Sequence, residues 1–111
     1  MKKETLLDLI SELVGTKTET INNANTNPFE IGKCYLIRTV TLYYTGKVKA
    51  HCGQFMQLEE AAWIPDTGRW AEACEKGTFN EVEPFANDPW INLQSIIDTQ
   101  EITYKLPKTT K

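Results

Sequence analysis

Apolar residues recur at helical spacing near the start of the chain, between residues 4 and 14. The spacing predicts an amphipathic helix within residues 1–15, followed by a linker over residues 16–28 that is rich in Thr and Asn. So short a helix is not stable alone in water, so we expect its apolar stripe to dock on the body or on another subunit. The stripe consists of Leu6, Leu9, Ile10, Leu13 and Val14, and the first four are candidate interface residues.

The body, residues 29–107, changes to a pattern typical of strands. Residues 34–44 are dense in β-branched and aromatic side chains and predict the strongest strand of the chain. After Gly46, residues 47–52 alternate strictly between apolar and polar, and residues 55–60 follow a tight turn. These segments predict a β-meander between Gly32 and Glu60.

A long connection is expected between residues 61 and 77, because the alternation ends there. Within it, side-chain capping around Asp66 and a stop at Gly77 predict a short helix. Trp70, Ala73 and Cys74 would share the buried face of this helix.

The last third of the body returns to strand patterns. Residues 79–85 predict a strand, and residues 90–98 predict a strand, a brief turn and another strand. Ile102, Tyr104 and Leu106 alternate before Pro107 and a basic tail. The whole pattern predicts a mainly β domain.

Composition and net charge make some classes of partner and location less suitable for this protein than others. The chain has 111 residues, 41% of them hydrophobic, which suits one domain, and self-association would add stability to a domain of this size. Its net charge of -3 is the wrong sign for a protein that neutralises phosphates, so nucleic acid ranks low among its partners. No apolar run is long enough to cross a membrane, and no secretory signal begins the chain. We therefore expect the protein in the cytoplasm.

The order of elements resembles small barrels of the SH3-like type, and among them the Sm and Hfq group. The resemblance rests on Gly32, on residues 44–48 around Gly46, on residues 53–58 and on residues 91–98. It implies a barrel of about five strands, with an N-terminal helix and a short helix in the long connection. Gly53 and Gln57 replace the Asp and Asn with which that family contacts nucleotides, and an Arg-Gly pair is missing from residues 93–95. An RNA-binding role is therefore the weakest alternative.

A second resemblance covers most of the body. The segments IRTVT (37–41), YTG (44–46), AAWIPDTGR (61–69) and EVEP (81–84) are similar to a group of uncharacterised small proteins encoded by phages and prophages. The resemblance implies a phage origin, with a role in virion assembly or in countering host defence. The protein would then be made in the host cytoplasm and, in the assembly role, enter the virion.

Few residues suggest catalysis. His51 and Cys52 point to opposite faces of a strand and cannot form a base and nucleophile pair. The three cysteines lack CxxC spacing and only one histidine accompanies them, so we expect no metal site, no cofactor and no enzyme activity. The carboxylates Glu59, Glu60, Asp66, Glu81 and Glu83 are expected to form a solvated acidic rim.

Two arginines remain as candidate ligand contacts. Arg38 interrupts the apolar face of the strongest strand, so it either pairs with a carboxylate such as Asp66 or Glu83 or binds an anion. Arg69 and Trp70 lie near a predicted helix N-terminus, where a phosphate could bind.

The tryptophans are large for so small a core, so Trp63 and Trp90 are interface candidates, although at least one of the three tryptophans is expected in the core. The best-supported hypothesis is a homo-oligomeric, non-enzymatic protein that assembles with other virion proteins. The alternative is a module that sequesters a small anionic ligand such as a nucleotide signal.

Overall fold

The computed structural model describes residues 27–111. The predicted N-terminal helix and nearly all of the linker, with Leu6, Leu9, Ile10 and Leu13, lie outside the described residues. The described elements are β1 (Cys34–Thr39), β2 (Tyr43–Cys52), β3 (Phe55–Asp66), α3 (Trp70–Lys76), β4 (Glu81–Pro84), β5 (Trp90–Asn92), the 3-10 helix η1 (Leu93–Ser95) and β6 (Ile96–Glu101).

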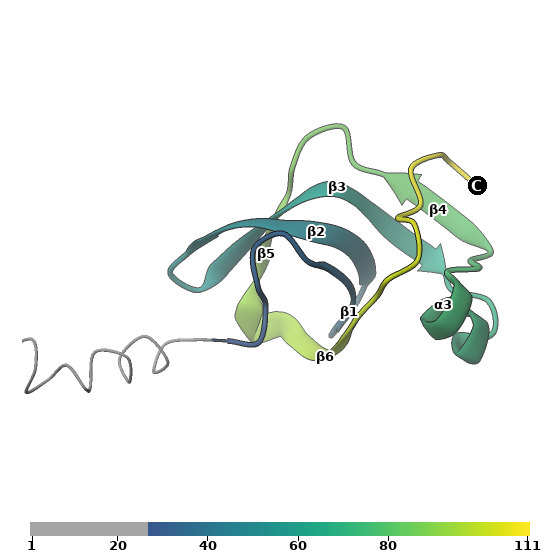
Figure 1. The fold of residues 1–111 in the computed structure, drawn as a ribbon, viewed down its shortest axis with the longest axis horizontal. Coiled ribbons are helices and arrows are strands. Elements are labelled where there is room, and N and C mark those ends of the chain that lie inside the picture. Colours follow the sequence, from purple (N-terminus) through teal and green to yellow (C-terminus); the bar gives the residue numbers. More distant parts are fainter. Residues whose placement is uncertain (1–26) are drawn as a thin grey trace, which may run out of the picture.

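Six antiparallel strands form one strongly curved sheet, with α3 beside the end of β3 (Figure 1). The strand order is β4-β3-β2-β1-β6, and β5 pairs with the first part of β3. The mainly β prediction is confirmed. Within residues 27–111 no ladder joins β4 to β6, so the sheet is open and closure into a barrel stays a prediction.

The predicted long strand over residues 34–44 is wrong, because the chain turns back within it. The Thr39 hydroxyl donates to the Leu42 carbonyl at 2.8 Å and accepts from the Leu42 amide at 2.9 Å, which closes a tight turn between β1 and β2. Val40, at the tip of this turn, is 70% exposed. The sequence pattern concealed the turn, since Val40 and Leu42 continue the apolar even-numbered positions of the predicted strand.

The predicted end of the third strand at Glu60 is also wrong, because β3 continues to Asp66. Between the pairs Lys47–Glu59 and Thr45–Ala62, β3 has one residue more than β2, and Glu60 takes a positive φ of 52°. Such a bulge exchanges the faces of the residues that follow it. This exchange, rather than the end of the strand, breaks the alternation.

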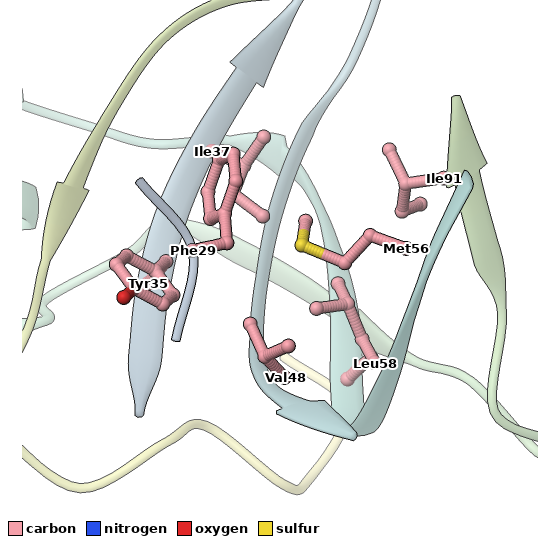
Figure 2. Close-up of a cluster of buried hydrophobic side chains, with 8 residues drawn as sticks. Phe29, Tyr35, Ile37, Val48, Met56, Leu58 and Ile91 are labelled. Atoms are coloured by element: carbon pink, nitrogen blue, oxygen red, sulfur yellow. The ribbon is translucent and has the colours of Figure 1, made fainter. Parts of the chain in front are cut away.

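Buried side chains form two clusters, one on each face of the sheet. Figure 2 shows the first cluster, whose members are Phe29, Tyr35, Ile37, Val48, Met56, Leu58, Ala61 and Ile91. The second lies under α3 and under the C-terminal segment, which is residues 102–111. Its members are Leu36, Ala62, Ile64, Ala73, Phe79, Val82 and Ile102. Burial on both faces explains why the first part of β1, from Tyr35 to Ile37, is continuously apolar.

Helix α3 ends at Gly77 as predicted, with φ at 71° and its amide bonded to the Ala73 carbonyl. The predicted side-chain cap is wrong. The predicted buried face is correct for Ala73 and for Cys74, which packs half-buried against the second core cluster, but wrong for Trp70, which is exposed. No side chain caps the helix, because the Asp66 carboxylate accepts from the Gly68 amide at 2.9 Å in the preceding turn. Of the helix residues only Ala73 is buried.

The C-terminal segment connects the two ends of the sheet. The predicted strand, turn and strand over residues 90–98 are confirmed as β5, η1 and β6, and β4 lies within the predicted range 79–85. The alternating residues 102–106 continue beyond β6 without strand structure and cross toward β4. There the Lys111 amide and carbonyl each bond to Val82 at 3.0 Å and cover part of the β4 edge.

Candidate functional site

Arg38 and Trp70, two of the predicted ligand contacts, lie together on the surface. The Arg38 guanidinium lies 5.7 Å from the centre of the Trp70 ring, and Tyr43 packs on that ring at 5.5 Å between centres. The three side chains lie at or near the ends of three elements. Arg38 is close to the end of β1, Tyr43 begins β2 and Trp70 begins α3.

The charge of Arg38 is paired within the chain. Asp98 lies opposite Arg38 in the register of β1 and β6, and its two carboxylate oxygens accept from the guanidinium, one of them from Nε at 3.1 Å. This hydrogen bonding raises the pKa of Arg38 further above its ordinary value. The partner is therefore Asp98 rather than Asp66 or Glu83. The pair lies at the rim of the sheet, with the Arg38 side chain 40% exposed, so the buried charge expected from the sequence is not present.

Arg69 occupies the N-cap position of α3 and its side chain is exposed. In residues 27–111 no hydrogen bond or ion pair joins it to Arg38 or Trp70. A ligand contact at Arg69 thus stays a prediction, without support from neighbouring side chains.

Trp63 lines a shallow apolar groove of about 440 Å³. Tyr44 lies opposite Trp63 in the register of β2 and β3, and the Tyr44 ring stacks on Phe85 at 5.9 Å. We call this surface the Trp63 groove; its lining residues are Leu42, Tyr44, Trp63, Glu83, Pro84, Phe85 and Ala86.

Trp90 lies in a second apolar depression, of about 310 Å³, that we call the Trp90 patch. Its other lining residues, Cys52 and Phe55, face each other at the tip of the hairpin between β2 and β3. Because Tyr44 and Cys52 are eight residues apart on one strand, the groove and the patch lie up to about 26 Å apart along β2.

The expectation that at least one tryptophan lies in the core is wrong. Trp63, Trp70 and Trp90 are 38%, 41% and 47% exposed, respectively. The cores are filled instead by aliphatic residues with Phe79, Phe29 and Tyr35. Sequence patterns missed Phe55 and Phe85 as surface aromatics, since a strand pattern alone does not tell which apolar face stays open.

Groups suited to catalysis are dispersed. His51 Nε2 lies 3.1 Å from the Phe29 carbonyl oxygen, and Cys34, Cys52 and Cys74 are free thiols. Within residues 27–111 no three His, Cys, Asp or Glu side chains converge as a metal set. No helix in the same range is long and apolar enough to span a membrane.

Comparison of the chain with protein families, curated proteins and solved structures finds no match.

Proposed function

We propose that this protein is a self-associating, non-enzymatic assembly protein of a phage particle, whose contacts are the Trp63 groove and the Trp90 patch. The observation that carries the proposal is the exposure of both tryptophans, each among further apolar side chains. Contiguous apolar surface of this kind marks interaction sites, and Trp is enriched in the energetic centres of interfaces.

The positions of the two surfaces favour head-to-tail association. They differ in shape and composition and lie at opposite ends of β2 and β3. If one surface binds the other on the next subunit, an open chain of subunits keeps one free groove and one free patch at its two ends, so it either grows into a filament or closes into a ring. Either assembly suits a virion component.

The connectivity supports a finer fold assignment, that of an SH3-like small barrel of the Sm type. Strand β5 pairs with β3, β6 pairs with β1, and the single turn η1 joins them, so one continuous segment connects both ends of the three-strand meander. In this proposal the open edge of β6 and the N-terminal residues 1–15 add contacts to neighbouring subunits.

The phage assignment comes from the resemblance of the segments at residues 37–46, 61–69 and 81–84. All three segments contribute directly to the Trp63 groove, through Tyr44, Trp63 and Glu83. The residues that carry the resemblance thus coincide with a proposed contact surface, and the other virion proteins are its further proposed partners.

Sedimentation equilibrium tests self-association. We expect the mean mass of the wild-type protein to rise between about 5 and 100 µM, and Trp63→Ser and Trp90→Ser each to lower it, since either loss removes one half of the contact. Trp70→Ser is the matched control, because Trp70 packs on Arg38 and Tyr43 of its own chain. A wild-type protein that stays monomeric at 100 µM contradicts the proposal.

A mixture of the two variants tests the head-to-tail arrangement. Trp63→Ser keeps an intact Trp90 patch and Trp90→Ser keeps an intact Trp63 groove, so the mixture should form dimers that cannot grow further. A mixture no heavier than its separate components would rule out pairing of groove with patch.

A further inference from the structure

A third cavity, of about 460 Å³, lies between the sheet and the C-terminal segment. Its lining residues come from four separate parts of the chain: Cys34, Lys47, Glu60, Tyr104, Lys105, Leu106 and Lys108. The volume falls within the range of sites that hold small molecules. We call it the lysine cavity.

The lining of the lysine cavity is positive, although the chain as a whole carries a net charge of -3. Lys47, Lys105 and Lys108 line the cavity together with one carboxylate, that of Glu60, which lies near Lys47 and Lys108. The nearby carboxylate of Glu101 does not line the cavity; it lies 3.8 Å from Lys33 Nζ, which it shares with Glu30 at 3.5 Å. Three ammonium groups against one carboxylate leave a surplus that attracts an anion.

Glu60 currently holds the position where an anion would bind. Its carboxylate lies 2.7 Å from Lys108 Nζ and 3.7 Å from Lys47 Nζ, and the hydrogen bond from Lys108 is the main cause of the lowered pKa of Glu60. The bulge in β3 places Glu60 there at the cost of a positive φ. Since Glu60 and both lysines are partly exposed, their ion pairs are weak and an incoming anion can replace the carboxylate.

The floor of the cavity is apolar. Leu106 and the Tyr104 ring are half-buried against the second core cluster, and the Tyr104 hydroxyl donates to the Ala73 carbonyl at 2.9 Å, which fixes the ring. Burial raises the pKa of the Cys34 thiol, so this group stays protonated and uncharged near neutral pH. An apolar part of a ligand therefore has a surface to cover.

We propose that the lysine cavity binds a small organic anion, in which a phosphate or carboxylate group contacts Lys47, Lys105 and Lys108 and a flat apolar body covers Tyr104 and Leu106. On binding, the anion takes the place of the Glu60 carboxylate. This site is separate from the tryptophan surfaces, so binding does not require self-association.

Phenyl phosphate is a suitable probe, because it joins a compact anion to one aromatic ring. Titration at constant ionic strength and pH 7.5, followed by amide chemical shifts in the full chain, should give saturable changes at Cys34, Glu60 and residues 104–108. Inorganic phosphate should bind several-fold more weakly, since it lacks the apolar body, and benzyl alcohol should not saturate. Shifts with phosphate equal to those with phenyl phosphate, or no saturable shifts at all, would overturn the proposal.

Variants that change one charge test the direction in which the affinity for phenyl phosphate changes. Lys105→Ser and Lys108→Ser should each weaken phenyl phosphate binding by roughly threefold to fivefold, whereas Glu60→Gln should strengthen it by roughly threefold, because the internal competitor is gone. Lys49→Ser is the matched control, since Lys49 pairs with Asp88 outside the cavity. Unchanged or weaker binding in Glu60→Gln, or equal loss in Lys49→Ser, contradicts the proposed site.

Discussion

Thr45 shows how much a single residue can contribute to the energetics of this sheet. It lies in β2 between Leu36 and Ala62 of the second core cluster, and it is fully buried. Its hydroxyl has no hydrogen-bond partner in residues 27–111. A buried polar group without a partner loses its hydration and gains nothing in return, at a cost of about 1–3 kcal/mol.

We therefore predict that Thr45→Val raises the free energy of unfolding by about 1 kcal/mol, because a methyl group replaces the unsatisfied hydroxyl at similar volume. Thr39→Val is the matched control. The Thr39 hydroxyl makes two hydrogen bonds to Leu42, so the same substitution there should lower stability by about 1 kcal/mol. Urea denaturation measures both changes. Destabilisation of similar size in both variants would show that Thr45 has a polar partner.

At the scale of elements, α3 and the C-terminal segment depend on close contact at one glycine. Gly77 ends α3 with φ at 71°, and a β-carbon there would lie 2.4 Å from the Tyr104 ring. The ring cannot withdraw without losing the bond from its hydroxyl to the Ala73 carbonyl. The helix terminus and the segment after β6 are thus fitted to each other.

Gly77→Ala should lower the free energy of unfolding by about 2–4 kcal/mol, which combines the left-handed backbone cost with overpacking. Gly53→Ala measures the backbone cost without the overpacking. Gly53 has φ at 59° but open space around its α-carbon, so only the backbone cost of about 1–2 kcal/mol is expected. Equal losses in the two variants, measured by urea denaturation, would mean that Tyr104 does not restrict the helix terminus.

The elements that the sequence predicted correctly are those with a local signal. Gly77 ends a helix because few other residues adopt a positive φ, and residues 90–98 combine a strand pattern with a turn. The turn at Thr39 and the bulge at Glu60 were missed for opposite reasons. The turn left the apolar pattern intact, whereas the bulge broke the pattern without ending the strand.

At the scale of the molecule, the surface sites could be predicted only in part. Trp63 and Trp90 are single, conspicuous residues and both are exposed, while their role in an interface stays a prediction. The lysine cavity combines residues from β1, β2, β3 and the C-terminal segment, up to 74 positions apart between Cys34 and Lys108. Only the register and the bulge bring them together, and neither has a sequence signal strong enough to predict it.

Four thiol and phenol groups of the described residues predict that the protein loses stability in alkaline solution. Burial raises the pKa of Cys34, Cys74, Tyr44 and Tyr104 in the folded protein. A group with a raised folded pKa keeps the folded state fully stable below its unfolded pKa. As the pH rises further, the unfolded chain releases the proton first and stability falls.

The loss should begin near pH 9, the ordinary value of a thiol, and become steeper above pH 10, where tyrosine titrates in the unfolded chain. Tyr104 should contribute up to about 1.4 kcal/mol per pH unit, and Tyr104→Phe removes this contribution. The variant starts less stable at pH 7, because the hydrogen bond to Ala73 is lost, but its deficit relative to wild type should shrink between pH 10 and 11.5. Urea midpoints at pH 7, 9, 10, 11 and 11.5 measure this convergence. A constant deficit across the range would mean that Tyr104 ionises as easily in the folded as in the unfolded chain.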